Sequence, residues 1–578
     1  MARSPREHLW AFLDHLDENP RLKRTLLIGL PVVAVAVGLG VWEYRSWART
    51  NSARIARQWL DAGRLDRAEV AVRDAMTAAP ALPVTWTLAS ELAWRKGNKQ
   101  ASVEYAKMAA VVGDYAPDDV LAWGEASALA GDADQAREAE VFLGPEARET
   151  PRAERLSGEI ARQGQRYPEA RDDFDAALRE DISSGAGPLA LDVIPLGIVS
   201  LQTGVAGDRS RGLALLEKWV PDAKWGVDAL RALLTDAVAH KDAKAATLWA
   251  ENLRMSQACT LGDIPVCMQA LATFDPEAYQ AMLGPLEEKS ASNPTRAALL
   301  LGWLVQIGRG GEAIRWGESL PAALSGKAPV APAIAEALRA TQRWADLQAW
   351  VEQGDWGRDM GFMAWAYGLV AARHLGNEAK AGAFWGSLRG DGISNAAHAL
   401  FAGDSLYAWG SPKEAAALLW SAAERPDLAY EALGSLARVY QLQRDAEGQY
   451  RAFSRLNEMR PADRKIANNY AYFAALTDLG IQTRVEPIAR DNFGHDPSNV
   501  NFRCTYAFVL VWSGQEARAM KLLAPVSRDW RKSPAVAFAY GAALASLGRK
   551  PEATEVFHSI NPRTLSLQEI AWVQAALK

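Results

Sequence analysis

Glycines recur every 34 residues along much of this chain, and this spacing limits the possible fold more than any other feature. The series has three members near the start, two in the middle and three near the end: Gly63, Gly97, Gly131, Gly376, Gly410, Gly480, Gly514 and Gly548. A period of roughly 20 to 50 residues indicates one supersecondary unit copied many times. The sequence therefore predicts a single repeat array, in which each unit contacts only its neighbours.

The residues around each glycine describe two amphipathic helices joined by a turn. Around Gly63, apolar residues follow i, i+3, i+4 spacing over 53–61 and again over 66–78. Glycine supplies the backbone freedom of a tight turn, and Pro80 ends the second helix. We expect about fifteen such pairs over 49–578, with weak repeats at about 180–290 and a capping helix at about 564–578.

The series also crosses stretches where glycine is missing. Gly308 fits the spacing, and the same arithmetic assigns turns to residues of other types: Gln165, His240, Phe274, Gln342 and Arg444. The loop-like stretch over 183–188 predicts an insertion, after which the repeat resumes near Gly207. Two extra residues are expected before the turn at Gly480.

Small residues at two fixed places in each unit resemble those of the tetratricopeptide repeat family. Seven positions before the turn they are Ala56, Ser90, Gly124, Gly403, Ala437, Ala507 and Gly541. In the second helix they are Ala68, Ala136, Ala170, Ala313, Ala381, Ala415, Ala519 and Ala553. The resemblance covers nearly nine-tenths of the chain. It implies an all-α, right-handed superhelical solenoid with a concave groove that binds peptides or protein surfaces.

An uncharged apolar run over 26–42 precedes the repeats and predicts a transmembrane helix over 25–43. At 1.5 Å per residue the run is about 26 Å long, within the range of spanning helices. Trp42, Tyr44 and Trp47 follow it as an interfacial aromatic belt would. A buried soluble helix is disfavoured because the run has no polar face. A cleaved signal peptide is disfavoured because the charged leader before the run is long.

The flanks of this run indicate its orientation. Arg21, Lys23 and Arg24 directly precede it, which favours a cytoplasmic N-terminus and repeats on the outer, periplasmic side of a bacterial inner membrane. The leader over 1–24 places Leu9, Trp10 and other apolar residues on one side of a short helix, a pattern of an amphipathic segment beside the membrane. A poorly ordered tail is the alternative interpretation.

The composition is that of a packed protein, and its charge argues against nucleic acid as a partner. Hydrophobic residues make up 49% of the chain and charged residues 23%, with a net charge of −5. There is no sustained stripe of Lys and Arg, which nucleic-acid binding would need. Most of the 22 tryptophans fall at apolar repeat positions, so we interpret them as packing between helices.

The sequence contains no catalytic or metal-binding constellation. The seven histidines are scattered without an HExxH pair, and the stretch over 324–327 lacks two features of a phosphate loop. Cys259 and Cys267 flank a predicted turn and are close enough for a disulfide in an oxidising compartment; the alternative is two small buried residues. Cys504 lies on a first helix and is expected to face the groove. We expect no enzyme activity, cofactor or metal.

Groove positions on the first helices of the later units are the candidate binding residues. They mix aromatic, charged and amide side chains, which suit peptide binding: Asp404, Tyr407, Arg438, Tyr470, Asn501 and Phe508. The leading hypothesis is a membrane-tethered scaffold that holds a protein or peptide partner. An export factor for envelope polysaccharide is the alternative, which exposed Trp and Tyr in the groove would favour. An enzyme with a catalytic unit hidden over 180–290 is the least supported. The sequence leaves the oligomeric state open.

Overall fold

The computed structural model describes residues 51–354, 356–357, 359–479 and 482–578, and within these ranges the chain is built of helices and turns without a strand. It divides into two compact units, Met1–Tyr279 and Gln280–Lys578. The predicted leader over 1–24 and membrane helix over 25–43 lie outside the described residues. Among the described helices, none combines the length and apolarity that crossing a membrane requires.

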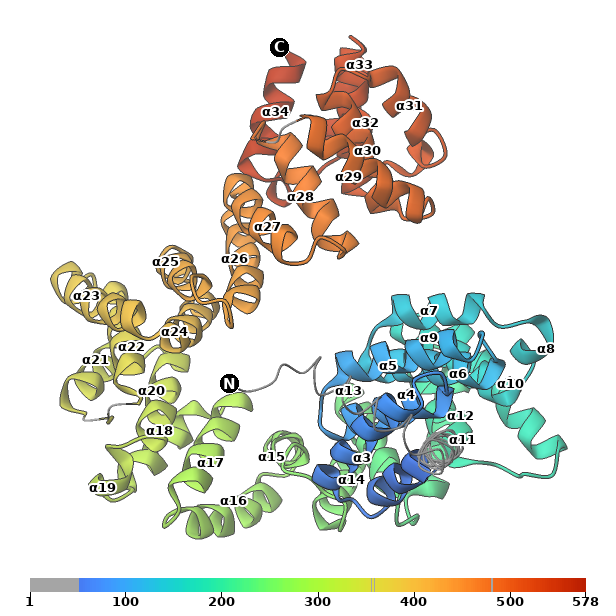
Figure 1. Ribbon diagram of the computed structural model, residues 1–578. Helices are drawn as coiled ribbons and strands as arrows, with labels where there is room; N and C mark the ends of the chain where they lie inside the picture. The colour runs from blue at the N-terminus through green and yellow to red at the C-terminus, as the bar shows by residue number, and fades with distance from the viewer. Residues whose placement is uncertain (1–50, 355, 358, 480–481) are drawn as a thin grey trace, which may run out of the picture. The chain divides into compact units, whose positions relative to one another are not determined.

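The first unit is a run of antiparallel helix pairs (Figure 1). A helix over 51–61 pairs with α3 (Leu65–Ala78). The next pairs are α4 (Pro83–Arg95) with α5 (Lys99–Val112), α6 (Pro117–Ala130) with α7 (Ala133–Val141), and α9 (Pro151–Gln163) with α10 (Tyr167–Ser183). The short α8 (Pro145–Arg148) precedes α9. Then come α11 (Ala190–Gln202) with α12 (Ala206–Trp219), and α13 (Gly226–Ala239) with α14 (Ala243–Met255). The helices α15 (Asp263–Phe274) and α16 (Pro276–Ser290) follow, and the boundary between the two units falls within α16.

The second unit repeats the same arrangement. Its pairs are α17 (Pro294–Gln306) with α18 (Gly310–Ser319), α20 (Val330–Ala340) with α21 (Trp344–Gln353), α22 (Gly361–His374) with α23 (Glu378–Ser394), and α24 (Ala396–Ala408) with α25 (Pro412–Ala423). They continue with α26 (Ala429–Gln443) and α27 (Ala446–Met459), α28 (Arg464–Leu476) and α29 (Gln482–His495), α30 (Val500–Trp512) and α31 (Glu516–Leu523), and α32 (Pro534–Ser546) and α33 (Lys550–His558). The short helices α19 (Ala322–Ser325), η1 (Ser527–Asp529) and η2 (Pro562–Thr564) lie between pairs, and α34 (Leu567–Leu577) ends the chain.

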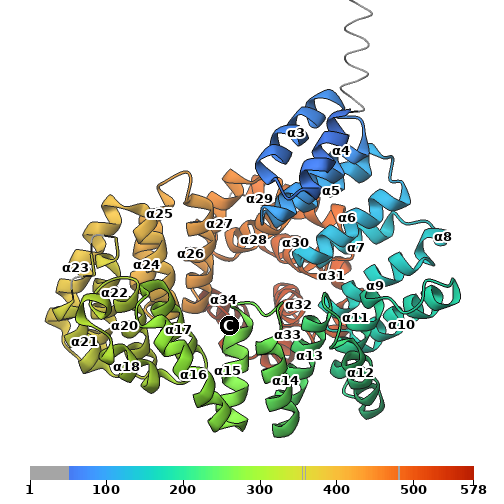
Figure 2. The same cartoon turned by 90° about the horizontal axis from the view of Figure 1, so that it is seen from below.

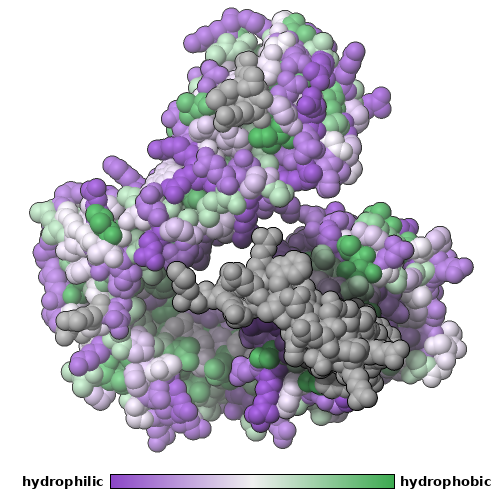
Figure 3. All heavy atoms as spheres, in the orientation of Figure 1, coloured by the Kyte–Doolittle hydropathy of each residue, from purple (hydrophilic) through white to green (hydrophobic). Residues whose placement is uncertain are grey.

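These described helices make fourteen pairs, with α15 and α16 between the sixth and the seventh and α34 at the end, whereas the sequence predicts about fifteen. Successive pairs of the second unit, from α17 to α25, lie beside one another in both views (Figures 1 and 2). Hydrophilic residues predominate on the face drawn in Figure 3, with apolar residues in scattered groups. The apolar faces of the helices thus lie mainly in contacts with other helices.

The turns carry the left-handed backbone that the glycine series predicts. Every glycine of the series that is described has a positive φ, from 67° at Gly63 to 85° at Gly131. Gln165, Gln342 and Arg444 adopt the same conformation, at 57°, 58° and 59°. The predicted turns at these three residues are therefore confirmed, although a side chain makes the left-handed region less favourable.

Four predicted turn positions are corrected by the backbone. The turn after the insertion lies at Gly204, three residues before Gly207, which is inside α12, and the next lies at Lys241 instead of His240. Phe274 ends α15, and α16 follows after an extended Asp275 without a left-handed residue. The turn expected at Gly480 lies at Asp478. Because Asp478 stands 34 residues after Arg444, the two extra residues follow this turn instead of preceding it.

Close contact between the two helices of a pair explains the small residues seven positions before the turn. A Cβ added at Gly541 would lie 2.7 Å from the Phe557 ring, and one added at Gly403 would lie 2.8 Å from Leu419. These distances are far below carbon–carbon contact, so a larger residue would push the helices apart. The register of each pair is set at this position.

Turn glycines offer a clean test of backbone strain. Nothing lies within 4 Å of a Cβ built at Gly308, whose φ is +78°. We expect Gly308→Ala to lower the free energy of unfolding by about 1 kcal/mol, because the left-handed conformation is strained for alanine. In the next turn, Gln342→Gly should raise it by a similar amount. Urea unfolding of both variants measures the difference, and shifts of the same sign would contradict the strain argument.

Candidate protein-binding grooves

In the first unit, a hollow of about 890 Å³ lies along α11, with walls from α9 and α13 and one edge at the end of α6. We call it the α11 trough. Its apolar lining comprises Leu129, Ala190, Leu191, Ile194, Pro195, Ile198, Leu201, Trp225 and Ala232. Leu191 and Leu129 remain 52% and 63% exposed. All of these elements are first helices of their pairs, so the trough lies on the face where the repeat family places its groove.

Proline gives α11 an unusual backbone. Pro195 lies inside this helix and has no amide hydrogen to donate to the carbonyl of Leu191. The carbonyl of Leu191, which lines the trough near the start of α11, is therefore left without its helical donor. An apolar surface with a backbone acceptor in it suits an extended or helical peptide, which brings both side chains and amide donors.

Charged side chains held in fixed positions border the trough. Arg231 donates two hydrogen bonds to Asp263, at 2.8 and 2.9 Å, and a third to Asp228 at 2.8 Å. Arg209 donates to Asp236 at 2.5 and 3.1 Å, and Nδ1 of His240 lies 2.9 Å from the carbonyl oxygen of that aspartate. The hydrogen bonds from Arg231 lower the pKa of Asp263 to about 2.

These pairs belong to a chain of Arg–Asp contacts between neighbouring repeats, and the chain occupies the region where the repeat signal is weak. One nitrogen of Arg155 donates to both Asp181 and Asp192, at 2.8 and 2.7 Å. Asp192 is fully buried, and burial raises its pKa although Arg155 is in contact. Arg171 and Asp208 form a similar link at 2.6 Å. The sequence analysis missed this network, whose only signal is Arg and Asp about one repeat apart.

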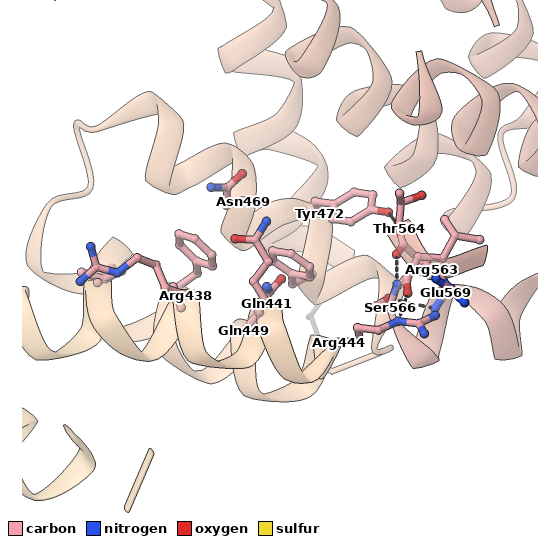
Figure 4. Close-up of a pocket in the computed structure, with 16 residues that line it drawn as sticks. Arg438, Gln441, Arg444, Gln449, Asn469, Tyr472, Arg563, Thr564, Ser566 and Glu569 are labelled. Carbon is pink, nitrogen blue, oxygen red and sulfur yellow. Dashed lines mark hydrogen bonds between the residues drawn. The ribbon is translucent and has the colours of Figure 1, made fainter. Parts of the chain in front are cut away.

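A second hollow, of about 750 Å³, lies in the second unit between α26, α27, α28 and the segment that leads into α34 (Figure 4). We call it the α26 pocket. Phe453 and Phe473 stack at 5.8 Å on one of its sides. Polar groups line the rest: Arg438, Gln441, Arg444, Gln449, Asn469, Arg563, Thr564, Ser566 and Glu569. The pocket therefore exists only because the end of the chain returns to a repeat about 120 residues earlier.

The structure brings together two of the six residues predicted for the groove. Arg438 lines the α26 pocket, and its guanidinium lies 3.8 Å from the carboxylate of Asp404, the equivalent residue of the preceding unit. Tyr407 is on the same helix as Asp404 and is partly exposed. Asn501 is exposed at the start of α30, where its backbone N–H donates a hydrogen bond to Oδ1 of Asn499.

Of the other two predicted groove residues, Tyr470 lies outside the pocket and Phe508 is corrected. Tyr470 is not in the lining of the α26 pocket, and its ring lies 6.0 Å from that of Tyr450. Tyr472, which stands 34 residues after Arg438, does line the pocket. Phe508 is fully buried, with Trp572 of α34 at 5.8 Å, so no partner reaches it in this arrangement.

The three cysteines are thiols in this structure. Cys267 and Cys504 are buried, and burial raises the pKa of each to about 12. Cys504 was expected to face the groove, but it lies within the core of the last repeats. Cys259 remains partly exposed. Over the described part of the chain, no group of three or more His, Cys, Asp or Glu side chains could hold a metal ion.

Comparison with known proteins adds little to this description. No family model matches the chain, and no curated protein does. Among solved structures, the crystal structure of the APC/C hetero-tetramer Cut9–Hcn1 matches with 9% identity over 83% of this chain and 99% of that one, at a TM-score of 0.27. A structure of Naa15/Naa10 bound to HypK-THB matches with 14% identity over 92% and 78%, at a TM-score of 0.22. With such low scores, the repeat architecture rests on the helices and turns described above.

Removal of the carboxylate that holds Arg231 at the border of the trough should weaken the fold in a pH-dependent way. We expect Asp263→Asn to lower the free energy of unfolding by about 1–2 kcal/mol at pH 7, because Arg231 loses a bidentate acceptor. The folded pKa of about 2 lies below the usual 3.8, so this contribution is present above about pH 4 and is lost as the pH falls towards 2. Denaturant unfolding at pH 7 and pH 2.5 measures it.

The control for this substitution is an exposed ion pair. Asp134 contacts Arg137 at 2.6 Å, and both side chains are more than half exposed. Asp134→Asn should leave stability unchanged within about 0.5 kcal/mol at either pH. An equal loss at pH 7 and pH 2.5 for Asp263→Asn would show that the carboxylate charge is not what stabilises the contact.

Proposed function

We propose that this chain is a membrane-tethered scaffold that binds a segment of a protein partner in the α11 trough. The observation that carries the proposal is the trough itself, an open apolar hollow on the first-helix face with Leu191 and Leu129 more than half exposed. Apolar surface of this kind, bordered by polar residues, is typical of sites that bind other proteins. The partner is held at the membrane by the apolar run over 26–42.

The chemistry of the trough favours an apolar peptide over a sugar polymer. Carbohydrate sites stack sugars on exposed aromatic rings, whereas Trp225 is the only Phe, Tyr or Trp among the described residues that line the α11 trough. The remaining apolar side chains there are aliphatic. Leu191, Ile198 and Leu201 offer a surface for aliphatic or aromatic anchors of a peptide.

The border of the trough favours a partner segment of low net charge. Glu159, Asp228 and Asp236 oppose Arg162 and Arg231, and each arginine is already paired. Because hydrogen bonds already hold these side chains before a ligand binds, binding costs little of their conformational entropy. An acidic segment would find no unpaired arginine at this border, so the proposed ligand is an apolar stretch with polar ends and without a net negative charge.

A charge placed in the trough should abolish capture of the partner. We expect Leu191→Glu to reduce the yield of cross-linked partner at least tenfold, because a carboxylate would have to be buried against an apolar ligand. Leu248→Glu is the matched control: Leu248 is 48% exposed on α14, outside the trough, and should leave the yield unchanged. Mass spectrometry after cross-linking of the full chain identifies the partner. Equal yields from both variants, or recovery of glycans alone, would reject the proposal.

The tether has a separate test. In spheroplasts of a bacterium that makes the full chain, we expect external protease to digest the repeats over 49–578 while a cytoplasmic protein survives. A variant that lacks residues 26–42 should leave the membrane fraction and become protected from the protease. Repeats that stay intact in the wild-type chain would place them on the cytoplasmic side, and a deletion variant that remains in the membrane fraction would reject the tether.

A further inference from the structure

The terminal helix α34 lies on the first helices of the last repeats, on the side where other units would present a groove. The ring of Trp572 lies 5.8 Å from Phe508 of α30, 5.9 Å from Phe538 of α32 and 6.4 Å from Phe557 of α33. The same cluster includes Tyr472 of α28, 5.5 Å from Phe508. Three repeats thus contribute aromatic side chains to one surface, and α34 covers it.

Polar contacts fix the segment that leads into α34. The guanidinium of Arg444 donates to the carbonyl oxygens of Pro562 and Leu565, at 2.6 and 2.5 Å. Its own carbonyl accepts from the amide of Leu567 at 2.9 Å. Figure 4 shows Arg444 reaching across to this segment beside the α26 pocket. The hydroxyl of Tyr472 donates to the carboxylate of Glu569, in the first turn of α34.

The body of α34 is held much less tightly than its beginning. No residue of α34 is fully buried, whereas Phe508 and Phe538 beneath it are 0% and 2% exposed. Beyond Glu569 its contacts with the repeats are apolar, made by Ile570, Trp572 and Val573. A helix of 11 residues is too short to persist alone in water, so α34 is helical because it is docked.

We propose that α34 is an internal ligand of this surface, and that an amphipathic helix of a partner protein replaces it. The features of the replacing helix are inferred from those of α34. It presents an aromatic side chain at the position of Trp572. Three residues earlier, at the position of Glu569, it presents a carboxylate that accepts a hydrogen bond from Tyr472. Helices that lay an apolar face into a groove are a common mode of recognition. This surface is in the second unit, so the proposal does not depend on the α11 trough.

Occupation by α34 sets the affinity of the partner. A tethered helix competes at an effective concentration in the millimolar range, so a helix added in trans binds to the fraction of chains in which α34 is undocked. Mutations that weaken the docking of α34 then strengthen binding in trans. This inverse relation distinguishes a competed groove from a surface whose only role is to support the last repeats.

The test uses the chain's own helix as the probe. A fluorescent peptide of residues 565–578 is titrated into the full chain, wild type and Trp572→Ala, and binding is followed by anisotropy. We expect the variant chain to bind the peptide about tenfold more tightly than the wild type, because its own helix no longer competes as well. Trp94→Ala, a change in the first unit, should leave the affinity at the wild-type value.

Changes in the peptide keep the test informative where Trp572→Ala prevents folding of the chain. A peptide carrying Trp572→Ala should bind at least tenfold more weakly than the native peptide, and one carrying Glu569→Gln should bind severalfold more weakly. Equal binding of all three peptides, or no binding to any chain, would overturn the proposal. A wild-type dimer that the native peptide dissociates would also overturn it, since the second occupant would then be another copy of this chain.

Discussion

Close approach of two helices at one small residue determines how each repeat of this protein is built. A Cβ at Gly541 or Gly403 would collide with Phe557 or Leu419 of the paired helix, so the pair can be no wider than these contacts permit. The left-handed turn seven residues later returns the chain at that spacing. Because the spacing is the same in successive units, the first helices present comparable faces, and the face of one unit continues in the next.

The sequence predicted most of this because turn and contact lie within one repeat. A turn glycine and a small packing residue are both visible as residue types, so the sequence alone indicates about fifteen units, about ten of them clearly. Prediction was wrong at one turn where a glycine stands close to the residue that takes the turn. Asp478 adopts a φ of 55°, and Gly480 two residues later drew the count away from it.

Contacts between distant residues could not be predicted in the same way. Arg444 binds the carbonyls of Pro562 and Leu565 across about 120 residues, and no periodic pattern encodes such a return. Phe508 was assigned to the groove because of its place in the repeat, but it is fully buried on the surface that Trp572 covers. Nothing in the sequence indicated that α34 covers this surface, since its residues have the pattern of an ordinary capping helix.

The region where the repeat signal is weak gains specificity from charge. Between Arg155 and Asp263, neighbouring repeats are joined by buried or half-buried Arg–Asp contacts, and Asp192 and Asp236 keep almost no exposed surface. A buried carboxylate left without its arginine is costly, so each contact admits one arrangement of the two repeats and penalises slippage. These contacts thereby keep neighbouring repeats in register around the inserted stretch after residue 183. The α11 trough lies among these contacts, where side chains that fix the repeats also border the surface open to a partner.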